Sequence, residues 1–140
     1  MPDLYLIAHV AGRAVAIESA AVESVVDIGD ITPVPRAPAT VRGLATLRSR
    51  VVTVIDTQVA LGGNAEAKAR RAVVTQVDGH HYAFLVDTLD DIAAFDLQPL
   101  AAGVALDGAW SEAGRGIVDR DGEPVLVIDL TALVPALTAA

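Results

Sequence analysis

Four arginines stand close together in residues 31–56, ITPVPRAPATVRGLATLRSRVVTVID, a stretch that holds no acid before Asp56. They are Arg36, Arg42, Arg48 and Arg50, and they give this stretch a local charge of +4 before Asp56 in a chain whose net charge is −8. A positive region on an acidic protein attracts and orients negatively charged partners. The interspersed prolines stiffen the segment, so that it loses little entropy on binding. The pattern predicts a docking surface.

The residue types needed for catalysis or metal binding do not fall into a recognisable arrangement. His9 is remote in sequence from the pair His80-His81, whose neighbouring side chains point to opposite faces at a predicted hairpin tip. Asp119-Arg120-Asp121-Gly122 resembles the start of a calcium loop, but the later oxygen ligands are missing and a tight turn is predicted. Asp90 and Asp91 are neighbours in the sequence. A catalytic pair of carboxylates needs burial and a fixed separation, which adjacent positions on a strand do not supply, so we expect a solvated acidic face here. No serine lies in a Gly-x-Ser-x-Gly frame.

Composition narrows the class of protein further. With 140 residues the chain is expected to form one domain, residues 1–140. Hydrophobic residues make up 53% but aromatic residues only 4%, which is typical of small β-barrels filled by Val, Leu, Ile and Ala. The single tryptophan, Trp110, is predicted to anchor the core, with a binding role as the alternative.

The same composition excludes several kinds of partner and chemistry. The absence of cysteine removes disulfides, thiolate catalysis and thiolate metal sites. An acidic pI of about 4.6 argues against binding to nucleic acid or anionic membranes. No long apolar run and no basic leader are present, so we expect a cytoplasmic protein without direct membrane insertion. Because the residues form no catalytic or metal-binding motif, we expect no cofactor.

Alternation of apolar residues predicts about nine short strands separated by turn signals every ten to twelve residues, a spacing typical of small barrels. The strands are expected at 4–10, 13–17, 22–28, 44–55, 72–77, 82–86, 89–97, 110–118 and 124–128. The apolar run from Val51 to Ile55 is expected to be covered on both faces. Short helical turns are expected at 18–21, at 56–61 with Asp56 as the N-cap, and at 130–137. Prolines 33, 35 and 38 predict an extended surface loop. Residues 64–71 are expected to form a mobile connection, and residues 98–108 a loop or a broken helix.

Two segments of the chain echo each other. VVTVIDTQVAL (51–61) and VLVIDLTALV (125–134) each run from a strand through Ile-Asp into a short helix. The echo predicts two similar lobes.

These residues resemble the CheW family of chemotaxis coupling proteins, in order and over nearly the whole chain. The resemblance rests on Val34-Pro35, Ala37-Pro38, Val41-Arg42-Gly43-Leu44, Leu47-Arg48, Val51 to Asp56 with Leu61-Gly62, Val86-Asp87, Gly116-Ile117-Val118 and Val127 to Leu130. It implies a mainly β fold of two packed SH3-like five-stranded barrel lobes with a few short helices.

The resemblance also implies a function. The protein is expected to be a non-catalytic adaptor that couples chemoreceptors, through their cytoplasmic tips, to the regulatory domain of a CheA-type histidine kinase. The residues at or beside the family's partner-contact positions are Val22, Val34, Arg42, Gly43, Leu44 and Arg48. No metal site is implied.

The chain departs from the family pattern at four places. Where the family usually has Asn-Leu-Arg-Gly, this chain has Thr46-Leu47-Arg48-Ser49. Thr53 replaces the usual proline, and Asp56-Thr57-Gln58 replaces the usual Asp-Leu-Arg. Ser24 stands where the family often has an acid facing its arginine, while Glu23 is expected on the opposite face of its strand. Replacing glycine by Ser49 is expected to tighten or reshape a turn.

Three other functions stay open at this stage. A divergent adaptor could serve pilus motility or another non-flagellar response. A small-ligand-binding barrel would require a cavity of about 300 Å³ or more, lined by apolar and a few polar groups. An enzyme would require a cluster of perturbed titratable groups.

Overall fold

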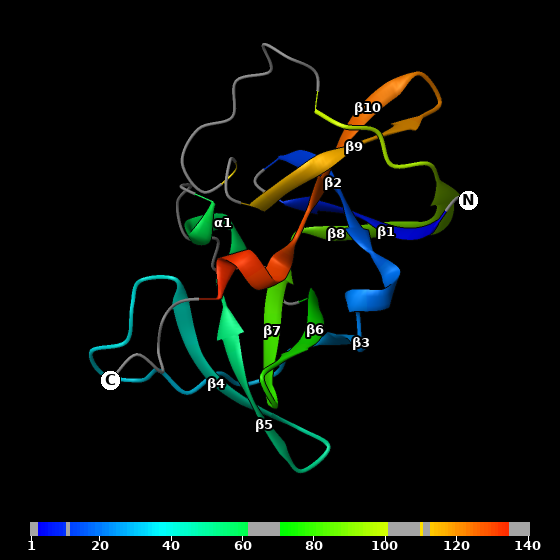
Figure 1. The fold of residues 1–140 in the computed structure, drawn as a ribbon. Helices are drawn as coiled ribbons and strands as arrows, with labels where there is room; N and C mark the ends of the chain where they lie inside the picture. Colours follow the sequence, from blue (N-terminus) through cyan, green and yellow to red (C-terminus); the bar gives the residue numbers. More distant parts are fainter. Residues whose placement is uncertain (1–2, 11, 62–70, 101–109, 111–112, 135–140) are drawn as a thin grey trace.

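Ten strands in two five-stranded sheets make up the computed structural model, which describes residues 3–10, 12–61, 71–100, 110 and 113–134 (Figure 1). The strands are β1 (Asp3–Val10), β2 (Arg13–Glu18), β3 (Ser24–Asp27), β4 (Val41–Leu47), β5 (Arg50–Ile55), β6 (Arg71–Val77), β7 (His80–Val86), β8 (Thr88–Phe95), β9 (Gly114–Arg120) and β10 (Glu123–Ile128). Short helical segments follow three of the strands: η1 (Ser19–Ala21), α1 (Thr57–Ala60) and η2 (Leu130–Leu133).

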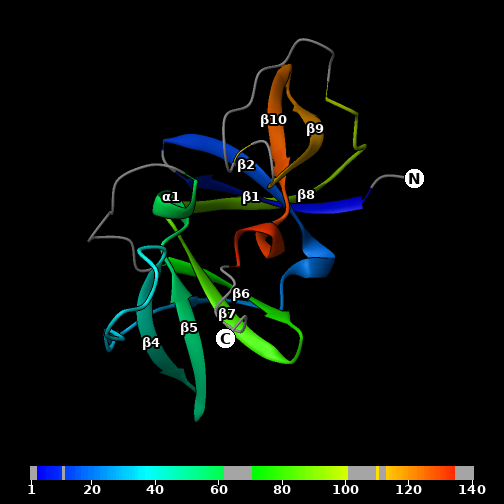
Figure 2. The same ribbon diagram turned by 60° about the vertical axis from the view of Figure 1, so that its left-hand side comes forward.

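Each sheet forms one lobe. The sheet ordered β8-β1-β2-β10-β9 combines strands from both ends of the described chain, and we call the described residues within 3–18 and 87–134 the terminal lobe. The sheet ordered β3-β6-β7-β5-β4 comes from the middle, and the described residues within 19–86 are the central lobe. Figures 1 and 2 show that β1 and β2 (blue) lie together with β8, β9 and β10 in one lobe, and that β4 to β7 lie in the other.

The two lobes have the same strand arrangement. In the terminal lobe the hairpin β1–β2 pairs in parallel with β10, and in the central lobe the hairpin β6–β7 pairs in parallel with β5. The chain therefore repeats one five-strand pattern, first as β1–β5 and then as β6–β10. The hairpin that opens each repeat shares a sheet with the last three strands of the other repeat, so that each lobe contains strands of both. The echoing segments 51–61 and 125–134 occupy corresponding places, β5 with α1 and β10 with η2. The prediction of two similar lobes is confirmed.

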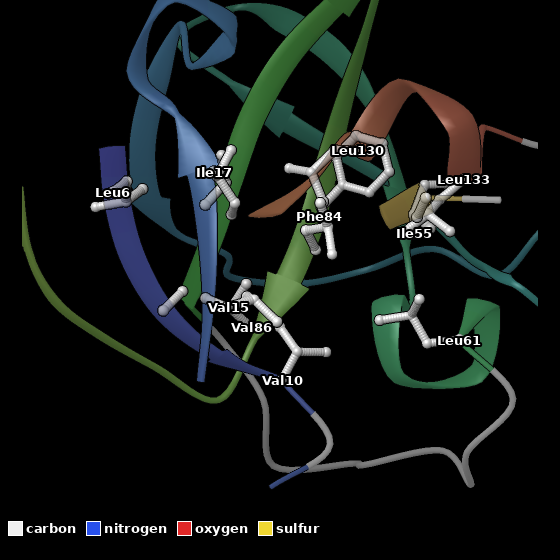
Figure 3. Packing of buried hydrophobic residues seen from close by; sticks show 14 of the residues in the cluster. Leu6, Val10, Val15, Ile17, Ile55, Leu61, Phe84, Val86, Leu130 and Leu133 are labelled. Atoms are coloured by element: carbon white, nitrogen blue, oxygen red, sulfur yellow. The ribbon is translucent and has the colours of Figure 1, made fainter. Parts of the chain in front are cut away.

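Alternating side chains of the central strands enter different cores, which explains why the sequence of these strands is nearly all apolar. On β7, Ala83 and Leu85 fill the central lobe while Phe84 and Val86 point into a shared inter-lobe core. On β1, Ile7 fills the terminal lobe while other residues face the shared core. Figure 3 shows this inter-lobe core, in which Leu6, Val10, Val15 and Ile17 meet Ile55, Leu61, Phe84, Val86, Leu130 and Leu133.

In each lobe, the segment that follows one edge strand meets the opposite edge strand. Thr32, after β3, bridges Leu44 on β4, and Gln98, after β8, bridges Ile117 on β9. Both bridges lie beside a glycine with positive φ, Gly43 at 152° and Gly116 at 154°. A Cβ on either glycine would overlap the carbonyl oxygen of the bridging residue. The close approach of the two segments therefore requires glycine.

Most predicted elements are confirmed, including the two hairpins 4–17 and 72–86, the helical turn at 18–21 and the Asp56-capped helix. Residues 44–55, however, form parts of two strands, β4 and β5, joined by a turn at Arg48-Ser49. Of the predicted terminal helix 130–137, Leu130–Leu133 form a 3-10 segment, and residues 135–137 lie outside the described residues. Trp110 is partly buried and packs against the inter-lobe core. The guanidinium carbon of Arg13 lies over the indole ring, 4.6 Å from the ring centroid. The predicted connections 64–71 and 98–108 lie largely outside the described residues.

Replacing either bridging glycine by alanine should destabilise the protein. For Gly43→Ala and Gly116→Ala we expect a loss of about 3 kcal/mol in the free energy of unfolding, from an unfavourable φ and a steric overlap with backbone. Urea denaturation measures the effect. Gly29→Ala is the matched control, since a Cβ added at Gly29 would have no other atom within 4 Å, and it should change stability by less than about 0.5 kcal/mol. Equal stability of all three variants would contradict the close-approach interpretation.

Candidate functional site

The β4–β5 hairpin presents an exposed surface that combines apolar and cationic groups. Register pairs Leu44 with Thr53 and Thr46 with Val51, so that these four side chains share the outer face of the hairpin. Leu44 is 36% exposed and Val51 is 61% exposed. Thr46, Leu44 and Val51 line an open hollow of about 570 Å³. Exposed apolar residues gathered on a hairpin at the edge of a sheet are typical of an interaction surface.

Arg48 lies at the tip of this hairpin. Leu47 pairs with Arg50, so the connection has two residues, Arg48 at φ 49° and Ser49 at φ 69°. Both residues adopt the left-handed conformation of a type I′ turn, which favours Asn and Gly. Arg48 is exposed and forms no ion pair with the carboxylates of the described residues. The turn therefore directs a guanidinium into solvent, and Ser49 in place of glycine keeps the turn at some cost in backbone strain.

A second hollow of about 490 Å³ lies between β3 and this hairpin. At its rim, Arg50 Nη1 lies 2.8 Å from His81 Nε2 and 3.6 Å from Glu23 Oε1. His81 Nε2 also lies 3.2 Å from Glu23 Oε2. The acid that faces the arginine-rich hairpin is thus Glu23, and it contacts Arg50 rather than Arg48. No sequence pattern revealed this group of three side chains, because they come from three separate segments.

Arg42 has a different environment from Arg48. Its Nη2 lies 2.5 Å from Oδ2 of Asp56, whose side chain is only 4% exposed. The other carboxylate oxygen, Oδ1, accepts a hydrogen bond from the backbone N–H of Val59 and so caps α1. A buried carboxylate held in this way orients β4, β5 and α1 relative to one another. The guanidinium of Arg42 therefore serves the fold, and a contact with a partner would have to use its remaining exposed part.

The six residues singled out by the resemblance lie in the central lobe, but not all of them are accessible. Val34, Leu44 and Arg48 are exposed. Val22 is partly buried against the inter-lobe core, and Arg42 is partly buried beside Asp56. Gly43 is buried at the bridge to Thr32. Val51, predicted to be covered on both faces, is exposed instead, because it opposes Thr46 on the outer face.

In the terminal lobe the corresponding edge is acidic. Arg120 on β9 donates to Asp90 at 3.0 Å and to Asp91 at 3.5 Å on β8, and thereby connects the two edge strands. The hydrogen bond to Asp90 raises the pKa of Arg120 above its usual value. Close to this edge, Leu4 and Ile92 are 54% and 58% exposed and extend the face that carries the inter-lobe core. Inside the lobe, burial raises the pKa of Tyr5, and the charges of Asp3 and Glu18 add to the effect.

These features do not favour a ligand-binding barrel. The interiors of both lobes are filled by their own side chains, and the hollows lie at the surface with charged or exposed residues at their rims. Among the described residues, no three His, Asp or Glu side chains gather as metal ligands would. Within the same residues, no helix is both long enough and apolar enough to cross a bilayer.

Comparison with known proteins identifies the family. A family model described as CheW-like domain matches residues 4–137. The chain belongs to the CheW-like family. A chemotaxis protein CheW of Rhizobium meliloti is 34% identical over 110 residues, which cover 75% of this chain and 70% of that protein. A chemotaxis protein CheW of Thermotoga maritima is 26% identical over 127 residues, covering 90% and 83% of the two chains.

The fold agrees with this family. A crystal structure of the scaffolding protein TtCheW from Thermoanaerobacter tengcongensis superposes with a TM-score of 0.82 at 22% identity, covering 95% of this chain and 92% of that one. The expectation of a CheW-like, mainly β fold is confirmed. The function that goes with the family is that of a chemotaxis adaptor coupling receptors to the kinase CheA.

Arg42 and Arg48 should respond differently to the same substitution. Arg42→Gln leaves the buried Asp56 carboxylate without its cation, so we expect a loss of about 2–3 kcal/mol in the free energy of unfolding. Arg48→Gln removes only a solvated charge and should change stability by less than about 0.5 kcal/mol. Chemical denaturation of both variants tests this. A similar loss in both would show that Arg48 also supports the fold.

The strained turn offers a stabilising substitution. Glycine at position 49 adopts the positive φ without steric cost, so Ser49→Gly should raise the free energy of unfolding by about 0.5–1 kcal/mol and the melting temperature by about 2 °C. Ser24→Gly is the control, because Ser24 lies in β3, where the substitution should be neutral or destabilising. Calorimetry distinguishes the two variants. A lower melting temperature for Ser49→Gly would contradict the strain argument.

Proposed function

We propose that this protein is a non-catalytic, cytoplasmic adaptor that binds the regulatory domain of a CheA-type histidine kinase and the cytoplasmic tip of a chemoreceptor at two separate surfaces. The observation that carries the proposal is the pair of exposed apolar regions on different lobes. One is the outer face of the β4–β5 hairpin, with Leu44, Val51 and the cationic tip Arg48. The other is the Leu4–Ile92 surface of the terminal lobe.

The arrangement suits an adaptor because the two surfaces are rigidly related. Both lobes contribute side chains to the inter-lobe core, so that a partner held by one lobe keeps a fixed position relative to a partner held by the other. Each exposed region is small, which is typical of transient signalling contacts with dissociation constants nearer micromolar than nanomolar. Many such contacts in one assembly bind tightly together through multivalency.

The residues at the hairpin surface of the central lobe divide into those that contact partners and those that support the surface. Val34, Leu44 and Arg48 are accessible and are assigned to partner contact, together with Val51. Arg42 and Gly43 are assigned a supporting role, because one is held by Asp56 and the other sits under the Thr32 bridge. Val22 is half-buried against the inter-lobe core and is left with only part of its side chain for a partner.

A non-catalytic role is supported by the distribution of titratable groups. In the described parts of the chain, the charged side chains at the hollows are exposed: some, such as Arg48 and Asp96, form no ion pair with the described residues, and others form surface ion pairs such as Arg50–Glu23. Such pairs lack the burial and convergence of catalytic acid–base groups.

The decisive experiment measures binding of each partner to one variant of each surface. With a purified kinase regulatory domain and a receptor cytoplasmic fragment, Arg48→Glu and Ile92→Asp should each weaken binding of one partner by at least about tenfold, which corresponds to about 1.4 kcal/mol. The other partner should bind each variant normally. Isothermal calorimetry with about 100 μM protein covers the expected affinity range.

Arg71→Glu is the matched control, because it reverses one exposed charge in the central lobe away from the hairpin turn. It should leave both affinities unchanged. No binding of either partner to the unmodified protein would overturn the proposal, and loss of both partners in a single variant would refute the separation of surfaces.

A further inference from the structure

One histidine ring nitrogen, at the hollow between β3 and the β4–β5 hairpin, faces two groups that make opposite demands on it. Nε2 of His81 lies 2.8 Å from Nη1 of Arg50 and 3.2 Å from Oε2 of Glu23. A guanidinium only donates hydrogen bonds and a carboxylate only accepts them, whereas a ring nitrogen accepts when it is bare and donates when it carries a proton. The proton on Nε2 therefore decides which neighbour His81 binds.

The distances assign the bare nitrogen to the arrangement in this structure. A separation of 2.8 Å is normal for an N–H donor and its acceptor, so Arg50 donates to a ring nitrogen without a proton. The two oxygens of Glu23 lie farther from Nε2, at 3.2 and 3.3 Å. The His81 side chain is only 14% exposed, so water competes little for the ring. In this state Arg50 connects the hairpin to β7.

Few other charged groups surround the ring. Within the described residues, the same hollow is lined by two further charged side chains, Arg48 from the hairpin tip and Asp27 from β3. Asp27 is held 2.8 Å from Arg71, and β6 places the uncharged Gln76 opposite His81. The two groups at Nε2 are thus the charged groups that contact the ring in the described part of the chain.

We propose that His81 is a positioning residue that sets the tip of the β4–β5 hairpin according to pH. When the ring is neutral, Arg50 donates to Nε2 and the base of the tip is held against β7. When Nε2 gains a proton, it donates to Glu23 and repels the guanidinium, so that Arg50 is released. Histidine is the residue type whose charge ordinarily changes between about pH 5 and 8.

The two contacts depend on pH with opposite signs. The Arg50 contact requires the bare nitrogen, so it is present at the higher pH and is lost as the pH falls and the ring takes up a proton. The Glu23 contact requires the proton and strengthens over the same range. The proton therefore transfers His81 from one partner to the other, and the position of the hairpin changes while the domain stays folded.

Arg50 carries the change to the tip of the hairpin. It pairs with Leu47 and closes the two-residue turn Arg48-Ser49, in which both residues have positive φ. Freeing its guanidinium removes a side-chain contact where the turn joins β5, so the turn should open more often. An effect on a partner rests on the proposed function, but the response of the hairpin belongs to the chain alone and is tested without any partner, so that either can fail separately.

The first measurement uses the unmodified protein. Nitrogen-15 NMR of the histidine rings distinguishes a bare ring nitrogen from a protonated one, and we expect Nε2 of His81 to be bare at about pH 8 and protonated at about pH 5. The backbone amides from Leu47 to Val51 should shift along the same titration curve. After correction for intrinsic rates, hydrogen exchange at these amides should be at least about threefold faster at about pH 5.5 than at about pH 7.5.

Variants then show whether the response passes through His81 and Arg50. His81→Gln does not titrate, so the pH-dependent shift of the tip amides should fall to less than about a fifth of its normal size. Arg50→Gln should abolish the shift although the ring still titrates. Arg50→Lys should restore at least about half of it, because an ammonium is again repelled by the protonated ring.

His80→Gln is the matched control, because His80 is the adjacent residue of β7, is exposed and points to the opposite face of the strand. It should keep the full response. Circular dichroism confirms folding, and if His81→Gln does not fold, the ring measurement and the two Arg50 variants still decide. Four results would overturn the inference: a proton on Nε2 at about pH 8, no titration of the tip between about pH 5 and 8, a full response in His81→Gln or Arg50→Gln, and loss of the response in His80→Gln.

Discussion

The shared apolar core between the two sheets is the constraint on which the other features of the fold rest. Neither lobe could bury the second face of its central strands alone, since Phe84 and Val86 on one side need Leu6, Val10 and Ile17 on the other. This explains why the chain combines few aromatic residues with strands that are apolar on both faces. It also makes the two lobes one mechanical unit, which is the property that an adaptor requires.

The exchange of hairpins between the two five-strand repeats strengthens this unit. Because β1–β2 joins the lobe completed by β8, β9 and β10, the ends of the described chain are held in the same sheet. The parallel pairings of β2 with β10 and of β7 with β5 make both lobes depend on contacts between residues distant in sequence. Such contacts usually slow folding, but they couple the lobes more firmly than a simple linker would.

Within this frame, two arginines from one short segment have separate roles. Arg42 is held by a buried carboxylate that also caps α1, whereas Arg48 stands six residues later at the tip of a strained turn. The type of residue is the same, and only its position relative to the hairpin decides whether the charge supports the fold or faces a partner. The corresponding edges of the two lobes also differ, because Asp119 lines a hollow in the terminal lobe at the position where Thr46 lines one in the central lobe.

Local sequence was enough to specify the fold class, the doubling of the lobes, the tight turn at Asp78-Gly79 and the cap at Asp56, because these depend on periodicity and on residues with strong conformational preferences. Which arginines support the fold was settled by tertiary packing, since pairing with Asp56 or Glu23 joins separate segments. The exposure of Val51 and the burial of Gly43 under a bridge also follow from packing, because both depend on which strand or segment lies opposite. The turn at Arg48-Ser49 was hidden in the sequence because it contains none of the residues that favour positive φ, and the strand register imposes it instead.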